Sequence, residues 1–124
     1  MDMVSCAKGD VFRLASNVIV VKFHPGAAIE KKDIVLFINK SLWLSGGENF
    51  SILLDGNATL EVSDDAMTYA SQFENRKWKA LAIVARFTSG KLYADYFMKF
   101  SDNRRPVKIF KTPAQASVWL KKYL

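Results

Sequence analysis

Ser63, Asp64 and Asp65 form the first group of residues in this sequence that could carry chemistry. They follow a compact apolar segment, Phe50–Asp55, and a polar loop, and they open a segment with the apolar spacing of a helix. Loops after the carboxyl ends of strands hold phosphate sites and nucleophiles in α/β proteins. A serine in this place could accept a phosphoryl group. The alternative is structural, because a serine hydroxyl accepts a hydrogen bond from a free helix N–H and carboxylates complement the helix dipole.

A second candidate is the segment RFTSGK, Arg86–Lys91, which joins an expected strand to an expected helix. Backbone N–H groups at the start of a helix attract anions, and Arg86 and Lys91 would add positive charge. Thr88 or Ser89 would serve equally well as the helix cap. No nucleotide-binding fingerprint accompanies the segment, so an anion or ligand loop and simple capping are both open interpretations.

The remaining polar residues form no recognised motif for metal binding or catalysis. Asp55, Asp64 and Asp65 could offer oxygen ligands to magnesium, but no calcium-binding loop and no GxxxxGK motif accompanies them. His24 and Cys6 are each the one residue of their type, which excludes a Cys/His zinc site and an internal disulfide. No GxSxG motif supplies a serine nucleophile for His24. We expect no metal, no cofactor and no enzymatic activity.

Length and composition indicate one globular domain. The chain has 124 residues, of which 50% are hydrophobic and 24% charged, a balance that excludes extensive disorder and leaves no room for two domains. Its formal charge is +6, but the basic residues are dispersed, so we expect no nucleic-acid binding. We expect no signal peptide and no membrane span, because residues 1–10 lack a basic segment followed by an apolar run and no apolar run approaches the roughly 20 residues that span a bilayer. We expect one cytoplasmic domain over residues 1–124, with residues 1–9 as a flexible tail.

Apolar runs and turn signals predict an α/β fold. Five runs predict strands: Val11–Ala15, Val18–Phe23, Phe50–Asp55, Lys79–Ala85 and Pro106–Lys111. Four helices are expected: Ile29–Ser45 with a stop at Gly46-Gly47, a segment after Ser63, residues 90–100, and a last helix from Thr112-Pro113. The first two strands would form a hairpin with the two-residue turn Ser16-Asn17. The order ββαβαβαβα predicts a mixed, mostly parallel five-stranded sheet with four helices.

The first expected helix has two apolar sides. Its predicted buried face consists of residues that repeat every four positions: Ile34, Ile38 and Leu42. Leu36 and Trp43 point away from that face and share the outer side with polar residues, namely Lys32, Asn39 and Lys40. Leu36 and Trp43 could form an interaction surface, or neighbouring loops could cover them.

The third expected helix has one strongly apolar face, made of Leu92, Tyr93, Tyr96, Phe97 and Phe100. These side chains could fill the core, form a dimer seam or line a small apolar pocket. Core packing is the expectation. In the last helix, Ala116, Leu120 and Leu124 are expected to face inward.

The element order resembles that of the STAS/SpoIIAA-like group, which comprises anti-sigma-factor antagonists and their uncharacterised short relatives. The stretch ALAIVARFTSGKLYADYFMKF looks like the strand and aromatic-rich helix of the small, stand-alone bacterial members. PVKIFKTPAQASVWLKKYL resembles their closing strand-turn-helix, which ends in an apolar-Trp-Leu pattern, here Val118-Trp119-Leu120. The resemblance implies a SpoIIAA-like fold and a domain that binds a partner protein and does not catalyse a reaction.

The same resemblance bears on Ser63. Regulatory members of the group carry a phosphorylatable Ser or Thr at the start of the second helix, in an Asp-Ser-Ser-Gly type of turn. The matching region here is EVSDDAMT, in which Ser63 is the hydroxyl nearest the right place. Asp64 and Asp65 stand where the family has Ser-Gly, a departure that weakens the case for kinase control. A permanent carboxylate could also imitate a phosphorylated serine.

Two functions follow from these observations. The first is a non-enzymatic STAS-like protein-binding or regulatory domain, related to anti-sigma-factor antagonism, whose partner is a sigma-regulatory protein, a kinase or a second copy of the chain. The alternative is a carrier or sensor of a small apolar, lipid-like ligand or of an anionic ligand such as a nucleotide. The group is similar in fold to lipid-binding SEC14-type domains, which keeps the apolar ligand open.

Overall fold

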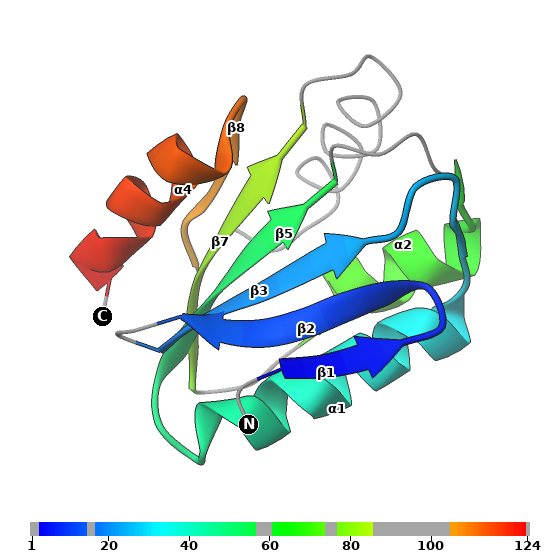
Figure 1. Ribbon diagram of the computed structural model, residues 1–124, viewed down its shortest axis with the longest axis horizontal. Helices are drawn as coiled ribbons and strands as arrows, with labels where there is room; N and C mark the ends of the chain where they lie inside the picture. Colours follow the sequence, from blue (N-terminus) through cyan, green and yellow to red (C-terminus); the bar gives the residue numbers. More distant parts are fainter. Residues whose placement is uncertain (1–2, 15–16, 57–60, 74–76, 86–104, 124) are drawn as a thin grey trace.

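A six-stranded sheet in the order β1-β2-β3-β5-β7-β8 forms the centre of the computed structural model (Figure 1). The structure describes residues 3–14, 17–56, 61–73, 77–85 and 105–123. The strands of this sheet are β1 (Met3–Cys6), β2 (Gly9–Leu14), β3 (Val18–Phe23), β5 (Phe50–Asp55), β7 (Trp78–Val84) and β8 (Val107–Phe110). A separate parallel pair joins β4 (Ala28–Ile29) to β6 (Glu61–Val62).

The six-stranded sheet is mixed. Strands β1, β2 and β3 pair antiparallel, whereas β3, β5, β7 and β8 pair parallel. In the parallel part, Val20 lies opposite Leu53, which lies opposite Ala82, and all three are buried. Continuous apolar runs form such strands because a parallel sheet is covered on both faces. The predicted mixed, mostly parallel sheet is confirmed.

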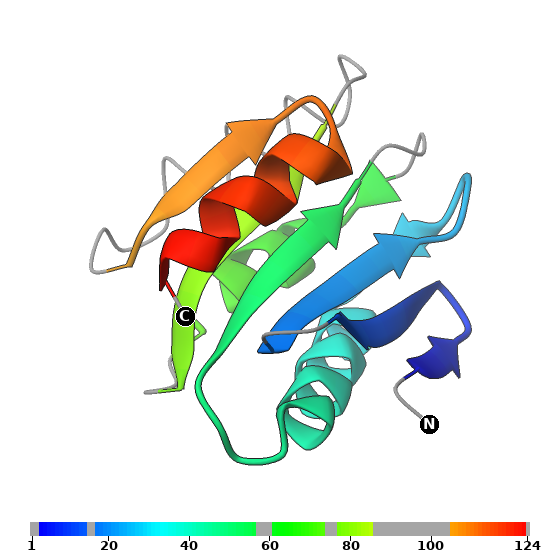
Figure 2. The ribbon, with the colours of Figure 1, turned by 60° about the vertical axis from the view of Figure 1, so that its left-hand side comes forward.

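Helices cover both faces of the sheet. α1 (Lys31–Ser45) and α2 (Asp64–Ser71) lie on one face, and α4 (Pro113–Leu120), continued by a 3₁₀ turn (Lys121–Tyr123), lies on the other (Figure 2). The core therefore has two parts. One packs Phe37 of α1 against the sheet, and the other packs Ala116 and Leu120 of α4 against the opposite face. The predicted inward direction of Ala116 and Leu120 is confirmed.

Three helix boundaries lie at residues whose side chains or backbone freedom predict them. Ser63 caps α2. Thr112 Oγ1 accepts a hydrogen bond from Gln115 N–H at 3.2 Å, and Pro113 stands in the first turn of α4. Gly46 ends α1 with a φ of 65°, a left-handed conformation that glycine adopts without strain.

Residues 3–6 form strand β1, so the predicted flexible tail over residues 1–9 is wrong. β1 pairs antiparallel with β2, and the register places Cys6 opposite Gly9. Val4 and Cys6 are partly buried against the core, and the alternate residues of β1 are exposed. An alternation over 4 residues is too short to stand out in a sequence. This additional strand is why the sheet has six strands where five were predicted.

The turn between β2 and β3 is longer than predicted. Leu14 pairs with Val18, so residues 15–17 connect the strands and the expected two-residue turn is wrong. Asn17 has a φ of 58°, a left-handed conformation that asparagine adopts more readily than most residues. Its side-chain amide donates to the carbonyl oxygen of Ser45 at 3.2 Å, which fixes the turn against the end of α1. Asparagine thus takes the place that glycine often holds in a hairpin turn.

The buried face of α1 is wider than the predicted one. Its buried residues include Asp33, Phe37, Ser41 and Leu44. The residues of the predicted face are partly buried: Ile34 and Leu42 pack against the core, and Ile38 is partly buried as well. Two of the additional buried residues are polar: the Ser41 hydroxyl donates to the Phe37 carbonyl oxygen at 2.8 Å, and the Asp33 carboxylate accepts from Glu30 N–H at 2.9 Å. Satisfied in this way, both polar groups can be buried.

The helices of the described residues also differ from the expected set at their limits. α1 begins at Lys31 and not at Ile29, because Ile29 belongs to β4 and pairs with Val62. Three α-helices lie within the described residues, whereas the helix expected over residues 90–100 lies outside them, as does Leu124. None of the helices in the described part of the chain is long and apolar enough to cross a membrane.

Candidate functional site

Ser63 occupies the N-cap of α2, and its backbone ties the start of this helix to β4. Its Oγ accepts a hydrogen bond from Ala66 N–H at 3.1 Å, and its own N–H donates to the Ile29 carbonyl oxygen at 3.0 Å. Asp64 and Asp65 lie exposed in the first turn, where their charges complement the helix dipole. The capping interpretation of this group is confirmed, and phosphorylation of Ser63 stays a prediction.

The surroundings of Ser63 are acidic. A depression of about 360 Å³ lies beside Ser63, between β4 and β6, and Glu30 and Glu61 line it. Lys32 Nζ pairs with Glu30 at 3.3 Å, whereas the carboxylates of Glu61, Asp64 and Asp65 add negative charge that disfavours a phosphate or nucleotide here. Within the described ranges, no group of three or more His, Cys, Asp or Glu side chains could hold a metal ion.

His24 and Cys6 both lie at β-strands near the edge of the sheet that β1 and β2 form. His24 Nε2 lies 3.4 Å from Asp10 Oδ1, and the His24 backbone N–H donates to the Lys8 carbonyl oxygen, so this residue fastens the end of β3 to the β1–β2 turn. Burial in β1 raises the pKa of the Cys6 thiol, and the charge of Lys40 opposes that effect. A raised pKa lowers the thiolate fraction at neutral pH, which disfavours Cys6 as a nucleophile.

The exposed side of α1 carries Leu36, Lys40 and Trp43 in a row along the helix, which we call the outer stripe. Trp43 is 67% exposed and Leu36 is 37% exposed. Within the described part of the chain no loop covers Trp43, so the alternative of covering loops is wrong for this residue. Lys40 is partly buried and places a positive charge between the two apolar side chains. Exposed apolar side chains that lie together are a feature of contact surfaces.

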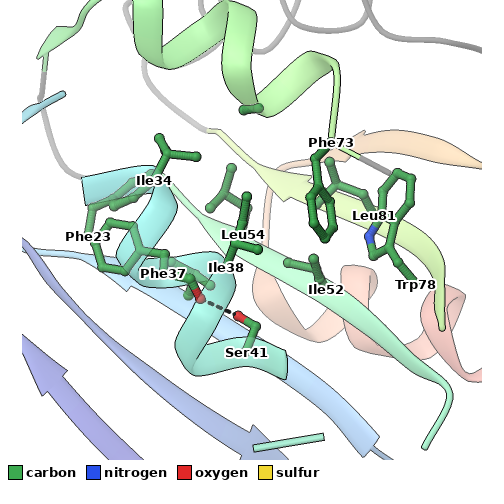
Figure 3. Close-up of a pocket in the computed structure, with 12 residues that line it drawn as sticks. Phe23, Ile34, Phe37, Ile38, Ser41, Ile52, Leu54, Phe73, Trp78 and Leu81 are labelled. Atoms are coloured by element: carbon green, nitrogen blue, oxygen red, sulfur yellow. Dashed lines mark hydrogen bonds between the residues drawn. The ribbon is translucent and has the colours of Figure 1, made fainter. Parts of the chain in front are cut away.

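An apolar pocket of about 90 Å³ lies between α1, α2 and the sheet (Figure 3). Its walls include Ile34, Ile38 and Ser41 of α1, Phe73 just after α2, and Trp78 and Leu81 of β7. The pocket explains why Ile34 and Ile38 are only partly buried. The sequence did not indicate the pocket, because its lining comes from two helices and three strands, which only the tertiary fold brings together.

Trp78 forms one wall of the pocket and is held from two sides. Arg105 Nε donates to the Trp78 carbonyl oxygen at 2.7 Å, and the Arg105 guanidinium lies 5.1 Å from the centre of the indole ring. The Phe73 ring meets the indole edge-on, with 6.3 Å between the ring centroids. Trp78 is 9% exposed, and its Nε1–H is buried without a hydrogen-bond partner among the described residues. Figure 3 shows this nitrogen on the edge of the ring that faces the pocket.

Comparison with known proteins identifies a family and a fold. The family model DUF7793, a domain of unknown function, matches residues 12–124. The chain belongs to this family. It is also similar to a solved structure from Shewanella loihica PV-4, an uncharacterised protein of the DUF3478 family with a SpoIIAA-like fold. The TM-score is 0.62 and the identity 16%, over 94% of this chain and 98% of that one, so the likeness concerns the fold alone. No curated protein matches the chain.

The predicted SpoIIAA-like fold of this DUF7793 domain is thereby confirmed. Of the predicted site residues, the Ser63 group lies at the start of α2 and the outer stripe lies on α1, so they form separate regions. Another predicted group lies outside the described residues: Arg86, Thr88, Ser89 and Lys91, together with the aromatic residues of the expected third helix.

Trp78 is the pocket residue of this DUF7793 domain whose role the sequence did not predict. A signal for it was present, because Trp78 opens an apolar strand and Phe73 stands at the end of the preceding helical segment. Two large aromatic residues on either side of a short connection are well placed to meet. Their contact with Ile34 and Ile38, however, depends on the packing of α1 beside α2 and has no local signature.

Proposed function

We propose that this DUF7793 domain is a non-enzymatic binding domain that contacts a partner protein through the outer stripe of α1. The observation that carries the proposal is the 67% exposure of Trp43 beside Leu36. Tryptophan is among the residues that contribute most to protein interfaces, because a large apolar surface becomes buried at little cost in conformational entropy. The regulatory role that the STAS resemblance implies, with a sigma-regulatory protein or a kinase as partner, is part of this proposal.

Charge favours an acidic partner over a second copy of the chain. Lys40 lies between Leu36 and Trp43, and the whole chain carries a formal charge of +6. A symmetric dimer places the same patch on both sides of the interface, so Lys40 would approach its own copy. An apolar surface flanked by Asp or Glu would instead pair with Lys40 and cover Trp43. Complementary charges of this kind also accelerate association.

The absence of an enzymatic role is supported by the state of the nucleophilic candidates in the described residues. The raised pKa of Cys6 disfavours its thiolate, and Ser63 uses its hydroxyl to cap α2. His24 lies within 3.4 Å of Asp10 on the partly exposed end of the sheet, and it is the one histidine of the chain. A domain of this kind acts through surfaces.

The experiment compares Trp43→Glu with a matched exposed control, Val118→Glu on α4, which is 64% exposed on the opposite face of the sheet. Proteins that the immobilised wild-type chain captures and Trp43→Glu does not are purified and titrated against each variant. We expect an acidic partner whose Kd rises at least about tenfold with Trp43→Glu and with Lys40→Glu, because a buried tryptophan anchor contributes about 2 kcal/mol or more. Val118→Glu should leave the Kd unchanged.

Two other occupants of the outer stripe are distinguished by the same variants. If the wild-type chain is a dimer by light scattering and Trp43→Glu makes it a monomer, the stripe is a self-association surface and the proposal is wrong. If the wild-type chain binds vesicles of phosphatidylserine and phosphatidylcholine and Trp43→Glu abolishes this, the stripe is a membrane-contact surface, which also contradicts the proposal. Equal binding of the purified partner to all variants would contradict it as well.

A further inference from the structure

We infer that the pocket between α1, α2 and the sheet binds a small apolar molecule with one uncharged hydrogen-bond acceptor, which the Trp78 Nε1–H recognises. The inference does not depend on the proposed function, because the pocket and the outer stripe lie on opposite sides of α1. The described residues leave the pocket partly open to solvent, so a ligand can enter.

The size of the pocket limits the ligand. Its volume is about 90 Å³. A single water needs about 10–15 Å³ of such space, and a cavity of about 150 Å³ lined by apolar residues holds benzene. The pocket is smaller than that cavity and therefore admits a compact group of about four heavy atoms, which is the size of a small ketone or of the end of an aliphatic chain.

The polarity of the lining restricts the charge and polarity of the ligand. The described lining residues are apolar except for Ser41, whose hydroxyl donates to the Phe37 carbonyl oxygen at 2.8 Å, and the indole nitrogen of Trp78. None of them is charged, so a carboxylate or ammonium group inside would lose its hydration without a counter-ion. An uncharged oxygen, such as that of a ketone, amide or ester, avoids this cost.

Trp78 Nε1–H is the group that makes the pocket prefer a ligand with a hydrogen-bond acceptor. The indole is 9% exposed, and its N–H is buried without a partner in the part of the chain that the structure describes. Unpaired buried donors are rare because they cost free energy. A buried water usually has about three polar partners, whereas Figure 3 places Ser41 across the pocket from Trp78. A ligand with one acceptor and an otherwise apolar body satisfies the donor and fills the space.

The geometry around Trp78 holds this donor in place before a ligand arrives. Arg105 fastens the Trp78 backbone and covers one side of its ring, and Phe73 packs against the ring edge-on. A donor fixed in this way loses little entropy on binding, which favours recognition of a weakly interacting small molecule.

The experiment follows the indole N–H signals of the full chain by ¹H–¹⁵N NMR. The three tryptophan signals are assigned with Trp43→Phe, Trp78→Phe and Trp119→Phe. The probes are acetone and 2-methylpropane, which have the same number of heavy atoms and differ in the acceptor oxygen. We expect acetone to shift the Trp78 signal saturably, and to bind about fivefold more tightly than 2-methylpropane, because a hydrogen bond between neutral groups contributes modestly.

Variants separate the pocket from the rest of the protein. Ala70→Phe, on the α2 wall, should abolish binding of both probes, and Trp78→Phe should abolish the preference for the ketone while the hydrocarbon still binds. Trp119→Phe on α4 and Trp43→Glu on the outer stripe should change neither. Absence of a saturable shift at Trp78, or an unchanged ketone preference in Trp78→Phe, would overturn the inference even if Ala70→Phe fails to fold.

Discussion

Arg105 lies over Trp78, with its guanidinium 5.1 Å from the centre of the indole ring, and its Nε donates to the Trp78 carbonyl oxygen at 2.7 Å. Trp78 begins β7, and Arg105 shortly precedes β8, so the two residues join the entry ends of neighbouring parallel strands. β8 is short and lies at the edge of the sheet. The pair therefore fastens an edge strand to the core and fixes one wall of the pocket.

Arg105→Ala should lower the free energy of unfolding by about 1–3 kcal/mol, because it removes a hydrogen bond from a charged donor together with the contact on the indole face. Urea denaturation measures the change. Arg105→Lys keeps the charge but not the planar group, and we expect it to recover only part of the loss. Equal stability of Arg105→Ala and the wild-type chain would show that the pair contributes nothing.

Gly9→Ala should be strongly destabilising for a steric reason. A Cβ at Gly9 would lie 2.6 Å from the carbonyl oxygen of Lys22 on β3, a distance that requires the backbone to move. We expect a loss of about 1–3 kcal/mol in the free energy of unfolding, as for other overpacked sites.

Gly56→Ala is the matched control, since its Cβ would meet the Val84 carbonyl oxygen at 3.4 Å, at the edge of ordinary contact. Its change in Tm should be well below that of Gly9→Ala. A similar change in both variants would mean that loss of glycine flexibility, and not the approach of β3, explains the effect.

The parallel core and the helix caps could be predicted because their causes are local. The run from Val18 to Phe23 is apolar enough to be covered on both faces, and Ser63 and Thr112 carry the side chains that cap helices. Strand β1 could not be predicted in the same way. Its 4 residues alternate too briefly to give a pattern, and only pairing with β2 makes them a strand.

The candidate sites were also predictable only where their cause is local. Trp43 was predicted on the outer side of its helix from spacing alone, and its exposure confirms that position. The buried side of the same helix was predicted only in part, because Ser41 and Asp33 are polar and become buried only through hydrogen bonds that the sequence does not display. The pocket beside Ile38 follows from helix packing, so no pattern of residues indicated it.

Ser63→Ala should lower the free energy of unfolding by about 1 kcal/mol, because α2 then loses the acceptor for Ala66 N–H. Ser63→Asp should restore most of this stability, since a carboxylate accepts the same hydrogen bond and complements the helix dipole. Ser71→Ala is the control within the same helix, because the exposed Ser71 hydroxyl donates only to the Thr68 carbonyl oxygen at the opposite end. If Ser63→Ala and Ser71→Ala unfold at the same urea concentration, the cap is not a source of stability.

Alkylation of Cys6 should respond to pH as a thiol with a raised pKa. Burial in β1 raises the pKa above the ordinary value, so the native chain should react more slowly with iodoacetamide than the urea-unfolded chain at moderately alkaline pH. Lys40 lowers this pKa through its charge, so Lys40→Ala should shift the alkylation profile to still higher pH.

The same shift has a consequence for stability. Because the native thiol keeps its proton to higher pH than the unfolded thiol, the contribution of Cys6 to stability is complete below the unfolded pKa and is lost as the pH rises through the native pKa. Cys6→Ser should therefore flatten the decline of stability above the unfolded pKa, as measured by urea unfolding across that range. Identical alkylation profiles of the native and unfolded chains would contradict a raised pKa of Cys6. Cys6 would then contribute nothing to the decline of stability at alkaline pH.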